Sequence, residues 1–230
     1  AGASFSINAD DAPGKQATKL EALPTTLDLS GASIPINLSE GNVNGQTFLI
    51  GHSSEKGWSA KVTSSNPRSP AVEGGMVVVG SGSNNLVYGY DVLTGERKWA
   101  ATSKDSGISD IVIGLGRAYY TTYSCTIESV RVADGQQMYS KYLAPTVDCA
   151  PDVRDGMVAT AFHKSSMWEV SMRDADSGNQ KWSSDLSSHG VLTAPIIMDS
   201  GVYVTTADGT LTRLNTKGGK KEWAADFGAV

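Results

Sequence analysis

The sequence predicts an all-β protein built from a repeated four-stranded unit, and three observations support this prediction. Four turn glycines recur along the chain, and each is followed four positions later by an aromatic residue. The pairs are Gly95 with Trp99, Gly135 with Tyr139, Gly178 with Trp182, and Gly219 with Trp223. The aromatic positions are 40, 43 and 41 residues apart, and short runs rich in Val, Thr and Tyr lie between them. Four strands in about 41 residues predict the blades of a β-propeller.

The residues before the first full repeat divide into two segments. Residues 1–44 are predicted to form an N-terminal arm or linker, because small and polar residues dominate them. Residues 45–230 carry the propeller repeats. Residues 45–66 are expected to be a partial blade, since the apolar run GQTFLIG precedes Trp58, which lies 41 residues before Trp99. Full blades are expected at about residues 69–108, 109–148, 149–190 and 191–228.

Each strand of the first repeat has a composition that suits its place in a blade. Residues 69–72 are small and apolar, as expected for an inner strand close to the propeller axis. Residues 76–79 are the most apolar and are predicted to be buried on both faces, whereas residues 86–90 alternate. The carboxylate of Asp91 is expected to cap the turn that contains Gly95. Trp99, on the outer strand, is expected to pack between adjacent blades.

The turn and the outer strand also carry a family motif. The segment from Asp91 to Trp99 reads Asp-x-x-Thr-Gly-Glu-x-x-Trp, and it resembles the repeat signature of quinoprotein-type, PQQ-like β-propellers. A close second copy runs from Asp174 to Trp182, and the second and fourth repeats contain looser copies. The resemblance covers about residues 55–228. It implies the fold more firmly than the function, because propeller repeats serve unrelated tasks.

Proteins with these repeats include PQQ-dependent alcohol and glucose dehydrogenases, and also the non-enzymatic lipoprotein of the bacterial outer-membrane assembly machinery. They usually close rings of seven or eight blades, whereas this chain has four repeats and part of a fifth. Two interpretations follow: an incomplete ring or open arc, which we favour, and a processed piece or fragment of a larger propeller. An open arc exposes strand edges and therefore favours a partner.

Composition excludes several other classes of protein. The chain has 230 residues, of which 40% are hydrophobic, so it can bury a core and does not resemble a disordered chain. No apolar run approaches the roughly 18 residues of a membrane-spanning helix. The net charge is −5 and no basic blocks occur, which argues against non-specific binding to nucleic acid. The high glycine content, 25 residues, is accounted for by the blade turns.

The sequence identifies no catalytic, cofactor-binding or metal-binding residue. The resemblance implies that an enzyme of this family would use Ca²⁺ ligands beside the quinone, a catalytic Asp and often a disulfide between adjacent cysteines. The chain has no adjacent cysteine pair, and no residue matches the quinone site. His52, His163 and His189 are scattered and lack metal-ligand spacing. We therefore expect no enzymatic activity and no cofactor.

The two cysteines are predicted to form a disulfide. Cys125 lies in a turn between the second and third strands of its blade, and Cys149 lies in the connection to the next blade. These two kinds of loop emerge on the same face of a propeller, and closing a loop of about 24 residues is worth roughly 3 kcal/mol. The bond would imply maturation outside the cytoplasm. Two independent thiols in a reducing compartment are the alternative.

The most consistent interpretation is a non-catalytic propeller that is secreted, at the cell surface or periplasmic, and that serves as a protein-interaction or assembly scaffold. Its expected partner is another protein or further blades of the same propeller. One alternative is a fragment of a PQQ- or metal-dependent dehydrogenase. Another is a subunit of an extracellular assembly.

Overall fold

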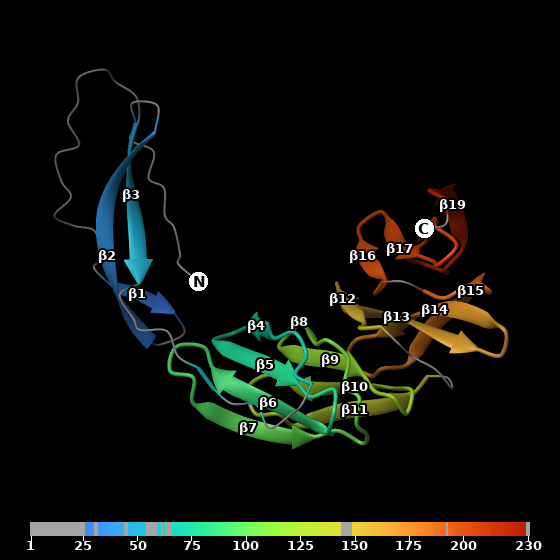
Figure 1. The fold of residues 1–230 in the computed structure, drawn as a ribbon, viewed down its shortest axis with the longest axis horizontal. Helices are drawn as coiled ribbons and strands as arrows, with labels where there is room; N and C mark the ends of the chain where they lie inside the picture. Colours follow the sequence, from blue (N-terminus) through green and yellow to red (C-terminus); the bar gives the residue numbers. More distant parts are fainter. Residues whose placement is uncertain are drawn as a thin grey trace. The chain divides into compact units, whose positions relative to one another are not determined.

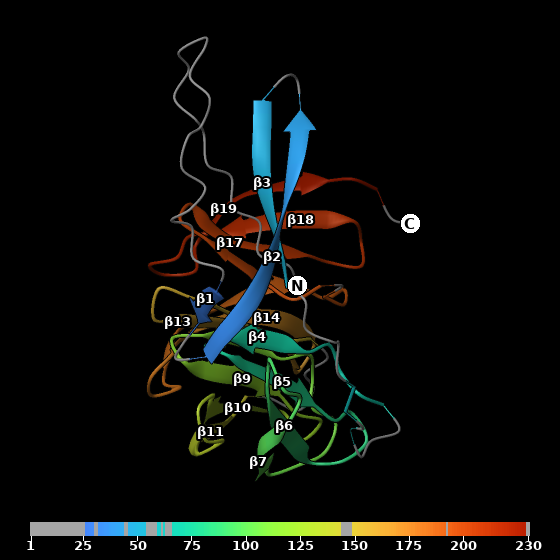
Figure 2. The ribbon, with the colours of Figure 1, turned by 90° about the vertical axis from the view of Figure 1, so that its left-hand side faces the viewer.

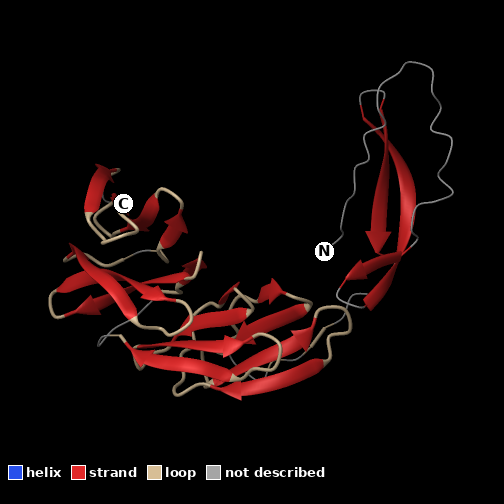
Figure 3. Ribbon diagram, turned by 180° about the vertical axis from the view of Figure 1, so that it is seen from behind, coloured by secondary structure: helices blue, strands red, loops and turns tan. Residues whose placement is uncertain are grey.

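The computed structural model describes residues 26–29, 32–43, 46–53, 59–60, 62, 66–143, 149–191 and 193–228. The described residues form nineteen strands and no helix, in agreement with the predicted all-β class (Figure 3). The chain divides into two compact units, Ala1–Ser59 and Ala60–Val230. Each unit has its own sheets.

The first unit contains one antiparallel sheet of three strands in the order β1-β2-β3. The strands are β1 (Thr26–Leu29), β2 (Ala32–Val43) and β3 (Gln46–Ser53). The long strands β2 and β3 pair antiparallel (Figure 2), and their register places Val43 opposite Gln46. Strands β1 and β2 lie in the segment predicted as an arm, and β3 lies in the predicted partial blade. Trp58, the expected aromatic of that blade, is outside the described residues.

The second unit contains four antiparallel sheets of four strands, which are the four predicted full blades (Figure 1). Blade 1 comprises β4 (Ala71–Glu73), β5 (Met76–Gly80), β6 (Leu86–Asp91) and β7 (Arg97–Thr102). Blade 2 comprises β8 (Val112–Gly114), β9 (Arg117–Thr121), β10 (Thr126–Arg131) and β11 (Gln137–Tyr142). Blade 3 comprises β12 (Asp152–Arg154), β13 (Met157–Lys164), β14 (Met167–Asp174) and β15 (Gln180–Ser187). Blade 4 comprises β16 (Ile196–Met198), β17 (Gly201–Thr205), β18 (Thr210–Leu214) and β19 (Lys221–Asp226).

Successive blades contact each other along their short inner strands, β4 to β8, β8 to β12 and β12 to β16. The inner strands have only three residues each, which suits elements that converge near a propeller axis. Among the described residues the blades form an open series, because blade 4 does not return to blade 1 (Figure 1). The ring is therefore not closed by this part of the chain.

The turn between the third and fourth strands has the same geometry in all four blades. We call it the acceptor turn; it spans residues 91–95, 131–135, 174–178 and 215–219. In each copy the glycine N–H donates to the carbonyl four residues earlier, over 2.8 to 3.0 Å. The glycine φ angles lie between 69° and 72°, a left-handed conformation in which a Cβ is unfavourable. A β-bulge in the adjoining strand pair accompanies each turn.

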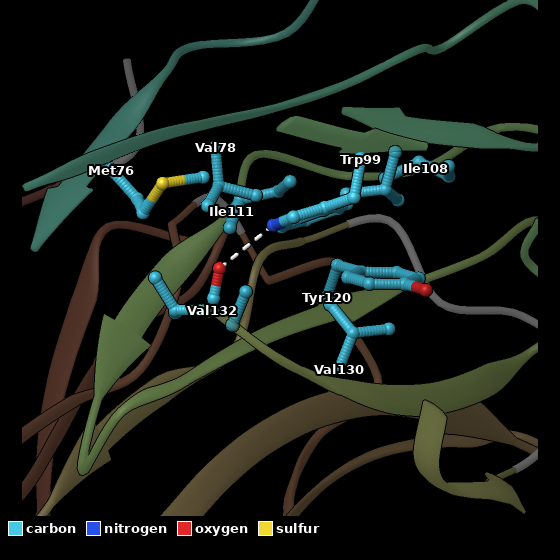
Figure 4. Close-up of a cluster of buried hydrophobic side chains, with 10 residues drawn as sticks. Met76, Val78, Trp99, Ile108, Ile111, Tyr120, Val130 and Val132 are labelled. Carbon is cyan, nitrogen blue, oxygen red and sulfur yellow. Dashed lines mark hydrogen bonds between the residues drawn. The ribbon is translucent and has the colours of Figure 1, made fainter. Parts of the chain in front are cut away.

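The hydrophobic core lies between the blades. The cluster between blades 1 and 2 is built around Trp99, with Met76 and Val78 from blade 1 and Tyr120 and Val130 from blade 2 (Figure 4). Equivalent clusters join blade 2 to blade 3 and blade 3 to blade 4. Because each cluster draws side chains from two sheets, burial of apolar surface depends on the neighbouring blade being present.

Candidate functional site

Three of the predicted aromatic residues, Trp99, Tyr139 and Trp182, lie at the interfaces between blades, where each ring lies against the acceptor turn of the following blade. A Cβ built on Gly135 would be 2.5 Å from the ring of Trp99, and one on Gly219 would be 2.4 Å from the ring of Trp182. These glycines therefore serve a second purpose besides their φ angle: they leave room for the indole. The glycine and the aromatic residue of the repeat signature are therefore the residues that bring neighbouring blades into contact.

A hydrogen bond orients each of these two indoles. Trp99 Nε1 donates to the carbonyl of Val132 over 2.8 Å, as Figure 4 shows, and Trp182 Nε1 donates to the carbonyl of Thr216, also over 2.8 Å. Both acceptors lie three residues before the turn glycine. A buried indole N–H needs an acceptor, so the acceptor turn supplies an apolar surface and a carbonyl together.

Tyr139 makes the interface between blades 2 and 3 different from the other two. Its ring lies against Gly178, where a built Cβ would be 2.7 Å away, but its buried hydroxyl has no hydrogen-bond partner among the described residues. The corresponding carbonyl, that of Ala175, instead accepts from the hydroxyl of Tyr119 and from Arg117. Burial raises the pKa of Tyr139, so the hydroxyl stays neutral. This interface therefore carries an uncompensated polar group.

The acidic residues of the repeat act as caps within the acceptor turns. Asp91 Oδ1 accepts from the backbone N–H groups of Leu93 and Thr94, and Asp174 Oδ1 accepts from that of Ser177. The N–H of Thr94 holds the pKa of Asp91 below its usual value, and the N–H of Ser177 does the same for Asp174. Because these carboxylates are occupied by their own turns, their role is structural.

Glu128 is a buried polar group that the sequence analysis did not identify. Its side chain is fully buried, and its two oxygens accept hydrogen bonds from two connected blades. The donors are Ser103, the N–H of Lys104, Tyr120, Thr126, Gln137 and Ser140. A buried carboxylate needs such donors to offset the loss of hydration. The equivalent positions in the other blades are Tyr88, Ser171 and Thr212, which carry a hydroxyl. A polar residue recurring at this position of the third strand was the signal that could have identified Glu128.

The Glu128 network fixes the connection between blades 1 and 2, because Ser103 and Lys104 begin that connection. The same connection continues through Gly107, Ser109 and Asp110, which line a surface cavity of about 170 Å³. The other lining residues are Arg68, Thr121, Tyr123 and Ala150. The cavity therefore lies where segments from the first three blades meet on one face of the second unit.

Hydrogen bonds hold the polar wall of this cavity in place. Arg68 Nε donates to the carbonyl of Ile108 over 2.8 Å, and Asp110 Oδ1 accepts from the N–H of Ser69 over 3.0 Å. Tyr123, in the turn between β9 and β10, is 61% exposed, and its ring lies over Gly107. The cavity thus combines a positioned guanidinium and carboxylate with an exposed aromatic ring. We call these residues the Tyr123 pocket.

The predicted disulfide is not formed in the structure. Cys125 Sγ donates to the carbonyl of Tyr123 over 3.3 Å, and Cys149 Sγ donates to that of Ala161 over 3.5 Å. Cys125 also packs against Phe162, so both side chains reach the same stretch of β13. The backbone at Cys125 has a φ of 63°, and its sulfur points back into its own loop. No disulfide is seen in the structure, and the bond between Cys125 and Cys149 stays a prediction.

The described residues do not fit a quinone site with a metal ion. They contain no group of three or more His, Cys, Asp and Glu side chains arranged to hold a metal. His163 lies beside the ring of Trp168, and His189 pairs with Asp208 over 3.3 Å, so neither belongs to a ligand set. The described residues also contain no helix with the length and hydrophobicity of a membrane span.

The fold and the repeated interfaces define the class of protein as a β-propeller. The family model described as outer membrane protein assembly factor BamB matches residues 44–138 and 126–228, and the chain therefore belongs to this PQQ-like family. This match confirms the resemblance seen in the repeat motif. No curated protein sequence matches the chain.

Solved structures show the same fold at low sequence identity. The designed Ika8 protein has a TM-score of 0.61 at 18% identity, covering 68% of this chain and 48% of that one. The quinohemoprotein alcohol dehydrogenase ADHIIG from Pseudomonas putida HK5 has a TM-score of 0.61 at 13% identity, covering 70% and 34%. The WD40 domain of coronin from Toxoplasma gondii has a TM-score of 0.55 at 15% identity, covering 69% and 45%. The chain therefore spans less than half the length of each of these proteins.

The buried hydroxyl of Tyr139 has no hydrogen-bond partner among the described residues. We therefore predict opposite changes in stability when two buried tyrosines are replaced by Phe. We expect Tyr139→Phe to stabilise the protein by about 1 kcal/mol, because it removes a buried hydroxyl without a partner. Tyr120→Phe should destabilise by about 1 kcal/mol, because it removes a donor to Glu128. Urea unfolding of both variants measures the difference. A Tyr139→Phe variant that loses as much stability as Tyr120→Phe would contradict this account.

Proposed function

We propose that the chain is a non-catalytic propeller scaffold that binds a protein partner through the Tyr123 pocket. The observation that carries the proposal is the size and lining of this pocket. Its volume, about 170 Å³, is below the roughly 300 Å³ at which small-molecule sites begin. A cavity of this size accepts a single side chain rather than a cofactor. Tyr and Arg, which are enriched in the energetically important parts of protein interfaces, both line it.

The polar wall indicates what kind of side chain the partner presents. The Arg68 guanidinium and the Asp110 carboxylate lie in one cavity beside the exposed ring of Tyr123. A partner residue with both a donor and an acceptor, such as a carboxamide, complements these two charges. Its stem would pack on the Tyr123 ring. The carboxylates of Asp91 and Asp174 are engaged in turns and that of Glu128 in its network, which further favours a scaffold over a catalyst.

Affinity capture from an extract of the source organism tests the proposal. We expect the wild-type chain to retain a specific protein, and we expect the double variant Arg68→Ala with Tyr123→Ala to retain at least tenfold less of it. Tyr142→Ala is the matched control, because Tyr142 is 65% exposed on the same blade but lies outside the pocket. Equal retention by the pocket variant and the control would contradict the proposal.

The competing function, a fragment of a quinone-dependent dehydrogenase, is tested by a separate measurement. The purified chain is mixed with PQQ and Ca²⁺, and its absorption spectrum and its reduction of an electron-accepting dye with alcohols are recorded. A scaffold gives no bound quinone band and no dye reduction above the mixture without protein. Turnover by the chain would contradict the scaffold proposal.

We also propose a location outside the cytoplasm, secreted, at the cell surface or periplasmic. The family includes an outer-membrane assembly factor, which supports this location. The side chains of Cys125 and Cys149 both reach β13. In an oxidising compartment we therefore expect the two thiols to form a disulfide: each loses a proton, and a disulfide oxidant takes up the two electrons.

Intact mass of the protein from its native source tests the location. We expect the protein to be lighter than its dithiol form by two hydrogens. Reduction should restore the mass of the dithiol form, and a Cys149→Ser variant should show no such difference before and after reduction. This bond would require the Cys125 loop to turn its sulfur away from the Tyr123 carbonyl. Two alkylatable thiols in freshly isolated native protein would contradict the proposed location.

A further inference from the structure

Unpaired polar groups gather in one of the blade interfaces, that between blades 2 and 3. Four buried side-chain atoms lack a hydrogen-bond partner among the described residues, and three of them, Ser129 Oγ, Tyr139 Oη and Arg173 Nε, belong to this interface. The fourth, Glu73 Oε2, lies in blade 1. Ser129, Tyr139 and Arg173 are 0%, 8% and 6% exposed. Such groups are rare in protein interiors, so three in one interface indicate an unidentified partner.

The strand register and one turn place the three groups in the same part of the interface. Ser129 is paired across the sheet with Tyr119 on one side and with Tyr139 on the other, and the two tyrosine rings are 6.5 Å apart. From blade 3, Arg173 Nη1 donates to the carbonyl of Gly178 over 3.0 Å. The ring of Tyr139 lies on that same glycine. The guanidinium and both hydroxyls therefore meet where blade 3 contacts blade 2.

Arg173 occupies a position that is aliphatic in the two neighbouring interfaces. It is the residue directly before the acceptor turn, and its cross-strand partner Val158 belongs to the cluster between blades 2 and 3. The same position is Val130 in blade 2 and Leu214 in blade 4, and each packs in the cluster with the preceding blade. The aromatic residue in those two clusters is tryptophan. At this interface a tyrosine and an arginine replace a tryptophan and an aliphatic side chain.

The charge of Arg173 has no counter-charge among the described residues. Its two Nη atoms donate to uncharged oxygens. The acidic side chains of the adjoining turn pair with other cations, Asp174 with Lys181 and Asp176 with Arg117. Burial lowers the pKa of Arg173 from its ordinary value, because desolvation disfavours the charged form. A buried guanidinium of this kind needs a compensating negative charge.

We propose that this interface binds a small monovalent anion of the size of chloride, at a site formed by Arg173, Tyr139 and Ser129. Arg173 Nε and the two hydroxyls donate to the anion, and its charge compensates that of the guanidinium. A water molecule accepts the same hydrogen bonds but leaves the charge without compensation. The aliphatic walls, from Ile127 and Val158, favour a monovalent ion over a multiply charged oxyanion, which loses more hydration energy on burial. We call this the Arg173 site; it is independent of the proposed function.

Thermal unfolding of the full chain in sodium chloride tests the proposal. Sodium gluconate keeps the ionic strength constant, because gluconate is much larger than chloride. Once the Arg173 site begins to fill, Tm should rise by about 3–5 °C for each tenfold increase in chloride. Arg173→Leu should abolish this dependence and still fold, since Leu214 holds the equivalent position in blade 4. Arg154→Leu is the matched control and should retain the dependence, because Arg154 contacts blade 4 and is paired with Asp199.

Variants of the two hydroxyls should weaken the effect without abolishing it. Ser129→Ala should raise the chloride concentration that gives half of the effect by about tenfold, because one hydrogen bond to a charged ligand is lost. Tyr139→Phe should be more stable than the wild type without chloride. This advantage should shrink as chloride rises, because the wild-type hydroxyl then has an acceptor.

A crystal structure from sodium bromide identifies the occupant directly. We expect an anomalous bromine peak within hydrogen-bond distance of Arg173 Nε, and no peak there in Arg173→Leu crystals. An equal chloride dependence of Tm in the wild type and in Arg173→Leu would overturn the proposal. So would a bromine peak without any chloride dependence in solution, which indicates an adventitious ion only. A water molecule at the site, or a direct hydrogen bond from Arg173 Nε to Tyr139, in place of the bromine peak would also overturn it.

Discussion

The structure of the second unit depends on one contact, an aromatic ring that lies on a glycine of the next blade. Each blade is a sheet of short strands that cannot bury its apolar faces alone. Trp99 and Trp182 join neighbouring sheets by filling the space above Gly135 and Gly219 and by donating to a backbone carbonyl of the same turn. The turn, the glycine and the aromatic residue must therefore occur together, which explains why they recur together in the sequence.

The same contact explains how the candidate surfaces arise. Where the series of contacts continues, side chains are buried and the loops between blades are fixed, as the Glu128 network fixes the connection beside the Tyr123 pocket. In blade 4, Ile196, Met198 and Trp223 stay exposed among the described residues. The fixed loops are a consequence of the repeat, and they offer a surface to partners.

The sequence predicted the parts of the structure that repeat. The spacing of Gly95 and Trp99 and of their equivalents was enough to predict four blades, because the turn and the aromatic contact are local features with a fixed period. Glu128 and the Tyr123 pocket occur once and combine residues from different blades, so no period reveals them. The cysteines show a further limit: loop type predicts which side of the blade they approach, but the backbone turn at Cys125 decides where its sulfur points.

The most direct measurement of the central contact compares two glycine substitutions. Gly135 and Gly116 have nearly equal φ angles, 72° and 70°, but only Gly135 has an aromatic ring above it, and the space around Gly116 is open. Gly116→Ala should cost about 1–2 kcal/mol from left-handed strain. Gly135→Ala should cost roughly 1–3 kcal/mol more in urea unfolding, because its methyl group also displaces Trp99. Equal losses in the two variants would contradict the claim that the aromatic contact joins the blades.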